Sequence, residues 1–229
     1  MGNKILTAFF CVLSMTAAAE ARTLDDVRSS GVVTCGLDPT KPGFSQRDAK
    51  YNWSGFYVDL CRAIAAAIFA DPSRTNLAGL APEESVIALQ SGEIDVLMQT
   101  EPLQSGKDAA DGLIWVVPFL HEKNSGLSSY APMVRQGDDQ WFQVVREVEF
   151  QLIRAATNGL TRAAAKAYLE ESPDSDADVT ILGLSPNWQM KVVAAAGNHA
   201  EILTRNLGEG ADKGVNAVWS KGGLHWAPP

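Results

Sequence analysis

The sequence lacks the basic clusters and short motifs typical of nucleic-acid-binding and many catalytic proteins. It holds 19 Lys and Arg residues against 27 Asp and Glu, which gives a formal net charge of −8. Such an acidic chain argues against nucleic acid or an anionic membrane as a partner, because both attract concentrated positive charge. The sequence also has no G-x-S-x-G elbow, no C-x-x-C pair and no phosphate-binding P-loop.

Histidine is scarce as well. His121, His199 and His225 are the only three, and none is paired with another at the short spacing typical of zinc ligands. We therefore expect three ordinary histidines and no metal centre. Because no cofactor motif and no paired general acid and base can be found, the sequence predicts a protein that is not an enzyme and holds no cofactor.

The N-terminus has the pattern of an exported protein. Lys4 precedes an apolar run at residues 5–15, which is followed by small residues and the triplet Ala19-Glu20-Ala21. This order is typical of a signal peptide at residues 1–21, cleaved after Ala21. The apolar run is too short to span a bilayer comfortably. The alternative is an uncleaved N-terminus that anchors the chain in the membrane.

Two of the three cysteines, Cys35 and Cys61, lie beyond this segment. In an oxidising compartment an even pair indicates a disulfide. Cys35 lies at the end of a predicted strand, and Cys61 lies in the helix that should pack on that strand. We therefore predict a Cys35–Cys61 disulfide; two buried thiols are the alternative.

Strand and helix patterns alternate along the first half of the chain. Residues 32–37 are apolar and β-branched, as in a buried strand. A βαβαβ order predicts an α/β fold with a mostly parallel sheet flanked by helices. Residues 38–55 are expected to form a long loop. The expected strands are at residues 32–37, 77–80, 94–98 and 113–117, and the expected helices between them are at residues 56–70 and 82–92.

The most informative stretch is YAPMVRQGDDQWF at residues 130–142. Residues 130–136 have an extended pattern, and Gly137 interrupts it. Asp138 can then cap a helix. Apolar residues at helical spacing predict that this helix continues to about Ala156.

This stretch closely resembles the return segment of periplasmic amino-acid-binding proteins of ABC transporters, the general L-amino-acid type. In that family the chain leaves a first lobe, builds a second, and re-enters the first through such a segment. The resemblance implies a periplasmic location, an ABC permease of the inner membrane as partner, and a free amino acid as ligand. Other segments that resemble the family, in family order, are VTCG at 33–36, PGFS at 42–45, NWSG at 52–55, ALQSGEIDVL at 88–97 and GVNAVW at 214–219.

Family members build their whole second α/β lobe before the return segment. Here only the 12 residues 118–129 separate the predicted fourth strand from it. They cannot form a lobe, because a single βαβ unit needs about thirty residues. The resemblance therefore implies one lobe over residues 22–229. Its expected parts are an N-terminal part at 22–117, a short replacement of lobe two at 118–129, and a returning part with C-terminal helices at 130–229.

In the family, a loop after the third strand carries an arginine followed by an aspartate, and the arginine clamps the ligand's carboxylate. The matching pair here is Lys107-Asp108. Lysine keeps the charge but loses the planar fork. The loop after the first strand lies where open α/β sheets bind ligands. The alternatives are a solvated Lys107 and plain core packing for Trp53. The candidate ligand-binding residues are Phe44, Ser45, Trp53, Thr100, Lys107 and Asp108.

Three function classes remain open. The first is a solute receptor that delivers amino acids to the permease. The second is a periplasmic scaffold or interaction protein that has lost ligand capture. The third, ranked last, is a dehydratase-like enzyme on the same fold. Because the family's second lobe supplies the acidic group for the ligand's ammonium, a one-lobed chain should bind amino acids weakly or not at all.

Overall fold

The computed structural model describes residues 22–172 and 182–229, so the predicted signal peptide lies outside the described residues. Its largest sheet has the strand order β5-β1-β6-β10-β7. β1 pairs in parallel with β5 and β6, whereas β10 pairs antiparallel with β6 and β7. The strands are β1 (Val33–Leu37), β5 (Thr75–Gly79), β6 (Val96–Met98), β7 (Leu113–Trp115) and β10 (Pro132–Arg135).

The prediction of an α/β fold with a mostly parallel sheet is confirmed, and β10 is the one strand of this sheet that runs against the others. β10 comes from the return segment and enters between β6 and β7. Met133 lies opposite Leu97 on one side and Trp115 on the other. The predicted extended segment at residues 130–136 thus joins the strands of the N-terminal part, although Tyr130 itself belongs to another strand.

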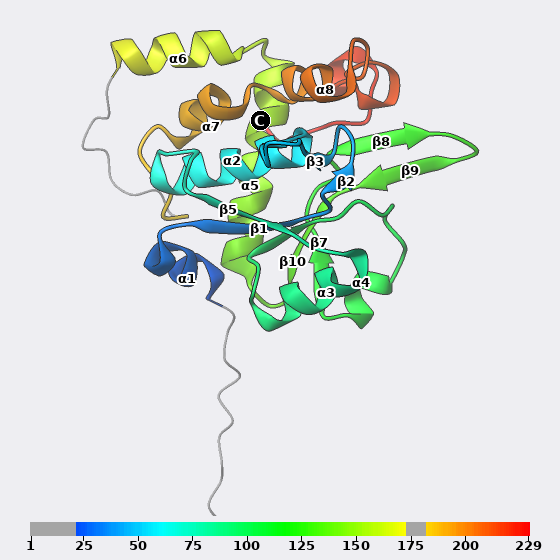
Figure 1. Ribbon diagram of the computed structural model, residues 1–229. Helices are drawn as coiled ribbons and strands as arrows, with labels where there is room; N and C mark the ends of the chain where they lie inside the picture. The colour runs from blue at the N-terminus through cyan, green and yellow to red at the C-terminus, as the bar shows by residue number, and fades with distance from the viewer. Residues whose placement is uncertain (1–21, 173–181) are drawn as a thin grey trace, which may run out of the picture.

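Helices cover the sheet on both sides (Figure 1). The figure shows α2, α6, α7 and α8 on one side and α3 and α4 on the other, with α5 passing between the two groups. Gly197 and Asn198 separate α7 from α8. The helices are α1 (Thr23–Ser30), α2 (Phe56–Phe69), α3 (Pro82–Ser91), α4 (Lys107–Ala110), α5 (Asp139–Thr157), α6 (Arg162–Glu171), α7 (Trp188–Ala196) and α8 (His199–Leu207), with 3-10 turns at Gly214–Asn216 and Trp219–Lys221.

Helix α2 is central to the core. It is apolar on nearly all sides, as expected of a helix enclosed between layers. Cys61 on this helix forms a disulfide with Cys35 of β1, and their Cα atoms lie 6.3 Å apart. Both residues are fully buried. The predicted disulfide is therefore confirmed, and it fastens the helix to the central part of the sheet.

Helix α5 begins where the sequence predicts. The Asp138 side chain accepts the backbone N–H of Trp141 at 3.1 Å through Oδ1, which is an N-cap. Its other oxygen, Oδ2, accepts the backbone N–H of Thr23 at 2.9 Å. One carboxylate thus caps α5 and also holds the start of α1, across 115 residues of chain.

Residues 118–129 lead into and form most of a β-hairpin. β8 (Leu120–Lys123) pairs antiparallel with β9 (Leu127–Tyr130), and Leu120 lies opposite Tyr130. At the tip, Asn124 N–H donates to the Gly126 carbonyl at 3.0 Å. Figure 1 shows the hairpin extending away from the helices and the main sheet. The chain therefore passes from β8 to β9 through residues 124–126 alone.

The expected long loop at residues 38–55 is the main difference from prediction. It folds as a small antiparallel sheet of β2 (Thr40–Lys41), β3 (Ser45–Arg47) and β4 (Trp53–Ser54). These strands are too short and polar to show a strand pattern. Gly55 ends the sheet with a φ of 132°, and a Cβ there would collide with the Phe44 carbonyl. Only glycine therefore allows β3 and α2 to approach so closely.

Candidate functional site

The carboxyl ends of β1 and β6 bring Asp38 and Thr100 together. Thr100 Oγ1 lies 3.5 Å from Asp38 Oδ2. The other oxygen, Asp38 Oδ1, accepts the Thr40 hydroxyl at 2.6 Å and the Thr40 N–H at 2.9 Å. Ser45 donates its buried hydroxyl to the Asp38 carbonyl at 2.7 Å. The polar groups of Ser45 and Thr100 thus serve the loop itself.

Phe44 belongs to an aromatic cluster rather than to an open wall. Its ring centroid lies 4.7 Å from that of Phe56, 5.9 Å from Tyr57 and 5.1 Å from Tyr130. Tyr57 Oη donates to the Gln99 carbonyl at 2.6 Å. Burial, followed by the nearby Glu149, raises the pKa of Tyr57 well above its ordinary value, so this hydroxyl stays protonated. The cluster joins the small sheet, α2 and the hairpin.

Trp53 packs against the end of β5. A Cβ at Gly79 would lie 3.3 Å from its ring, so the indole covers that glycine. The Arg47 guanidinium lies 5.0 Å from the ring centroid on the outer side. Trp53 is half-buried. This position agrees with the packing alternative for Trp53.

Lys107 and Asp108 lie in the short helix α4, which follows the segment that carries Thr100. Lys107 is exposed and lines a depression with Gln99, Glu101 and Trp115. That depression has only about 10 Å³ of free volume, room for about one water molecule. An amino acid does not fit there in this conformation. Glu101 also lies 4.0 Å from Lys41, so the local charge is already shared.

The three histidines meet in space, which sequence reasoning missed. The rings of His199 and His225 are 4.1 Å apart between centroids, and those of His121 and His225 are 4.8 Å apart. All three side chains are buried. Nothing in their spacing of tens of residues signals this contact; only the fold creates it. Among the described residues, no group of His, Cys, Asp and Glu is arranged to hold a metal ion.

Burial keeps these histidines neutral. It lowers the pKa of His199 to about 4 and that of His225 to about 2, and it also lowers the pKa of His121. His199 Nε2 lies 2.9 Å from the Phe119 carbonyl, and His121 Nδ1 lies 2.8 Å from Ser129 Oγ. The cluster therefore fastens the base of the hairpin to α8 and the C-terminal segment.

Comparison with known proteins shows which family this chain belongs to. No family model matches the chain. A general L-amino acid-binding periplasmic protein of Rhizobium johnstonii is 30% identical, with 100% of this chain and 99% of the relative covered. The chain belongs to the amino-acid-binding periplasmic proteins of ABC transporters. A glutamate/glutamine/aspartate/asparagine-binding protein of Rhodobacter capsulatus is 26% identical, with 97% of this chain and 98% of the relative covered.

A solved structure shares the fold. An ABC transporter periplasmic binding protein of Brucella ovis, with glutathione bound, matches with a TM-score of 0.81 and 25% identity. The match covers 91% of this chain and 99% of that chain. These relatives are named as binding proteins, the Brucella protein as one of an ABC transporter, and none of them is named as an enzyme. This agrees with the prediction that the protein is not an enzyme.

The alignment with the Rhizobium protein is much longer than this chain. It extends over 340 positions, whereas this chain has 229 residues, so at least 111 positions (340 − 229) face no residue of this chain. A deficit of this size is comparable to a small α/β domain.

Within the described residues, each helix is either too short or too polar to cross a membrane.

Proposed function

We propose that this chain is a periplasmic component of an amino-acid ABC import system that has kept one lobe and binds free amino acids weakly or not at all. The observation that carries this proposal is the direct connection of β8 to β9 through residues 124–126. In the resembling family a second lobe stands between the fourth strand and the return segment. The hairpin takes its place here.

The loss of the second lobe removes the opposite wall of the binding cleft. Tight capture of a small ligand requires that most of its surface and both of its charges be enclosed. Each charge-assisted hydrogen bond that is not made forgoes about 1.5–3 kcal/mol. Two such losses amount to roughly two to four decades in Kd, at about 1.4 kcal/mol per decade. We therefore expect a Kd weaker than about 0.1 mM for free amino acids.

The remaining wall supports the same expectation. The Ser45 hydroxyl and the Asp38 carboxylate are engaged within their own loop. Lys107 lies beside a depression that admits about one water molecule. A ligand would have to open these contacts before it could bind, and that rearrangement lowers its affinity further.

The relatives' names support the location and the partner that we propose. The Rhizobium relative is named as a periplasmic protein, and the Brucella protein as a periplasmic binding protein of an ABC transporter. In our proposal this chain is likewise exported and acts beside an ABC permease of the inner membrane. Removal of residues 1–21 as a signal peptide is part of this proposal. An N-terminus retained as an anchor would leave the same lobe on the periplasmic side.

Isothermal titration calorimetry of the purified protein tests this function. The ligands are the standard L-amino acids and glutathione, the ligand of the Brucella structure. We expect no Kd tighter than about 0.1 mM. We also expect little gain from Lys107→Arg, with Lys221→Arg as the matched exposed control. A micromolar Kd for any of these ligands would overturn the proposal.

A scaffold or interaction role is the second candidate. It is favoured by three large apolar side chains near the C-terminus, Trp219, Leu224 and Trp226, each at least half exposed. If no amino acid binds but the chain still crosslinks to the permease in inner-membrane vesicles, the scaffold role is preferred.

A further inference from the structure

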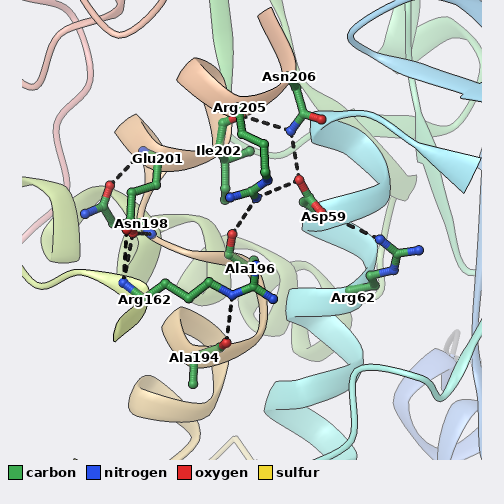
Figure 2. A network of polar contacts seen from close by, with 10 residues as sticks. All are labelled: Asp59, Arg62, Arg162, Ala194, Ala196, Asn198, Glu201, Ile202, Arg205 and Asn206. Carbon is green, nitrogen blue, oxygen red and sulfur yellow. Dashed lines mark hydrogen bonds and ion pairs between the residues drawn. The ribbon is translucent and has the colours of Figure 1, made fainter. Parts of the chain in front are cut away.

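A polar cavity lies on the face of the small sheet (β2, β3 and β4) that points away from the candidate amino-acid site. Its volume is about 630 Å³, within the usual range for small-molecule sites. α2, α6, α7 and α8 contribute to its walls, and residues of β3 and β4 close it. Figure 2 shows how four of its side chains lie: Asp59, Arg62, Arg162 and Arg205.

The small sheet separates this cavity from the candidate amino-acid site. Gln46 and Ser54 are opposite each other in β3 and β4, and both line the cavity. Their neighbours Arg47 and Trp53, also opposite each other, make the cation–π contact of the candidate site. Because side chains alternate between the faces of a sheet, the two sites use opposite faces.

The cavity carries positive charge in an acidic protein. Among the described residues that line it, three arginines outnumber the single carboxylate of Asp59, a balance of +2 against −8 for the whole chain. Glu201 lies close by in Figure 2, but its carboxylate accepts the backbone N–H groups of Arg162 and Asn198, at 2.9 Å and 2.8 Å. The Glu201 carboxylate is therefore already hydrogen-bonded to these two backbone groups.

Asp59 does not occupy all of the arginine donors. Its Oδ2 accepts Arg205 at 2.7 Å and the Asn206 amide at 2.8 Å, and Arg205 also donates to the Ala196 carbonyl. Arg62 only approaches Asp59 Oδ1, at 3.7 Å. This distance exceeds that of a hydrogen bond.

The third arginine is held in place by one nitrogen. Arg162 Nε donates to the Ala194 carbonyl at 3.2 Å, which fixes the side chain against α7. Within the described part of the chain, the two terminal nitrogens of Arg162 and the guanidinium of Arg62 make no hydrogen bond. Guanidinium groups with free donors match the planar oxygens of carboxylates and phosphates.

We propose that this cavity is a binding site for a small molecule that carries carboxylate or phosphate groups, with Arg62 and Arg162 as its principal contacts. Arg205, already paired with Asp59, holds the positive wall in place. The site is independent of amino-acid capture, since it lies on the other face of the small sheet and uses none of the candidate residues.

Titration calorimetry of the full chain at constant ionic strength tests this site. The probes are succinate and glutarate for the carboxylate source and inorganic phosphate for the phosphate source, with sodium chloride as the blank. We expect at least one probe to bind, and its affinity to fall at least about ten-fold in Arg62→Gln and in Arg162→Gln. The class of probe that binds identifies the source.

Two controls separate the site from general charge effects. Arg74→Gln removes an exposed arginine outside the cavity, whose guanidinium contacts Asp71, the Gly31 carbonyl and the Phe69 ring, and it should leave the affinity unchanged. Asp59→Asn removes the competing carboxylate but keeps an oxygen acceptor, so it should tighten binding several-fold. Because it predicts a gain, this variant does not depend on damage to the fold.

Several results would overturn the proposal. One is the absence of any probe-dependent heat beyond the chloride blank at 10 mM probe. Another is equal binding by the wild type, Arg62→Gln and Arg162→Gln. Loss of succinate, glutarate or phosphate binding in Lys107→Ala, with no loss in Arg62→Gln, would assign that binding to the amino-acid site instead.

Discussion

The imidazole of His225 lies 4.1 Å, centroid to centroid, from the imidazole of His199, and both rings are almost fully buried. His225 belongs to the C-terminal segment, His199 begins α8, and His121 of β8 completes the cluster. Three segments distant in sequence therefore meet at the base of the hairpin, and the contact requires neutral rings.

This contact predicts acid sensitivity. Burial lowers the pKa of His199 to about 4, below its ordinary value of 6.5. Between pH 6.5 and 4 the unfolded state therefore binds a proton that the folded state does not bind. As a result, stability that is present above pH 6.5 is lost as the pH falls toward 4. For one such group the loss approaches roughly 3 kcal/mol, at about 1.4 kcal/mol per pKa unit.

The variant His199→Gln tests this linkage. Its amide can still donate to the Phe119 carbonyl, but it does not titrate. We expect lower stability than wild type at pH 7.5, because the ring packing is lost, and a difference that narrows below pH 6. Chemical denaturation at several pH values measures it. Phe119→Leu removes a ring 4.8 Å from His199 but no titrating group. The stability of this variant should therefore change with pH in parallel with that of the wild type. Identical pH profiles for both variants would contradict this account.

Asp95 predicts the opposite dependence of stability on pH. Burial raises its pKa to about 6, although the Thr34 N–H donates to it at 2.7 Å. A folded pKa above the unfolded value of 3.8 contributes stability at low pH that is lost as the pH rises through 6. Asp95→Asn should therefore be more stable than wild type at pH 7.5, on the order of 1–2 kcal/mol after allowing for partial exposure.

Thermal melts at pH 5 and 7.5 measure this effect. The gain in Asp95→Asn should shrink at the lower pH, where the wild-type carboxyl is protonated in the fold. Asp25→Asn is the matched control, because Asp25 is exposed and forms an ion pair with the exposed Arg22. Its substitution should change stability by less than about 0.5 kcal/mol. An Asp95→Asn variant less stable than wild type at pH 7.5 would show that the Thr34 bond outweighs the burial of charge.

Asp138→Ala should lower stability by about 2–4 kcal/mol. It removes an N-cap, worth about 1 kcal/mol, and leaves the Thr23 N–H without its acceptor in a buried place. Asp138→Asn keeps one acceptor and should lose about half as much. Differential scanning calorimetry compares the two. Equal stability of the alanine variant and wild type would show that water replaces both bonds.

The residues that sequence reasoning placed correctly carry local signals. Asp138 follows Gly137 and precedes a helical stripe, so its cap could be predicted before its second bond to Thr23, which is a long-range contact. The disulfide could be predicted because one strand and the next helix are neighbours.

The arrangements that escaped prediction depend on contacts between distant segments. Arg62, Arg162 and Arg205 are separated by dozens of residues, and only the packing of α2, α6 and α8 brings them to one cavity. The three histidines are equally distant from one another. The strands β2 to β4 were missed for another reason: each has only two or three residues, which are too few to show alternation.

The disulfide should contribute about 3–4 kcal/mol. It closes a loop with a sequence separation of 26 residues, and the chain-entropy relation gives about 3.5 kcal/mol for that length. The double variant Cys35→Ala/Cys61→Ala should therefore melt roughly 7–14 °C below wild type, at about 2–4 °C per kcal/mol for a chain of this size. Addition of a reductant should lower the wild-type melting temperature and leave the variant unchanged. A reductant effect of equal size on both proteins would exclude the disulfide as its cause.

The hairpin tip should tolerate an insertion, because only residues 124–126 connect its strands and Leu127 beside them is largely exposed. Ten Gly and Ser residues added between Ser125 and Gly126 lengthen a loop of about three residues to about thirteen, at a cost of roughly 1.3 kcal/mol. The same insertion between Ala131 and Pro132 enters a buried stretch beside β10 and should unfold the protein. Circular dichroism melts compare the two. A tip insertion as damaging as the second one would mean that the tight hairpin is an essential part of the fold, and not, as we propose, a short replacement of a second lobe.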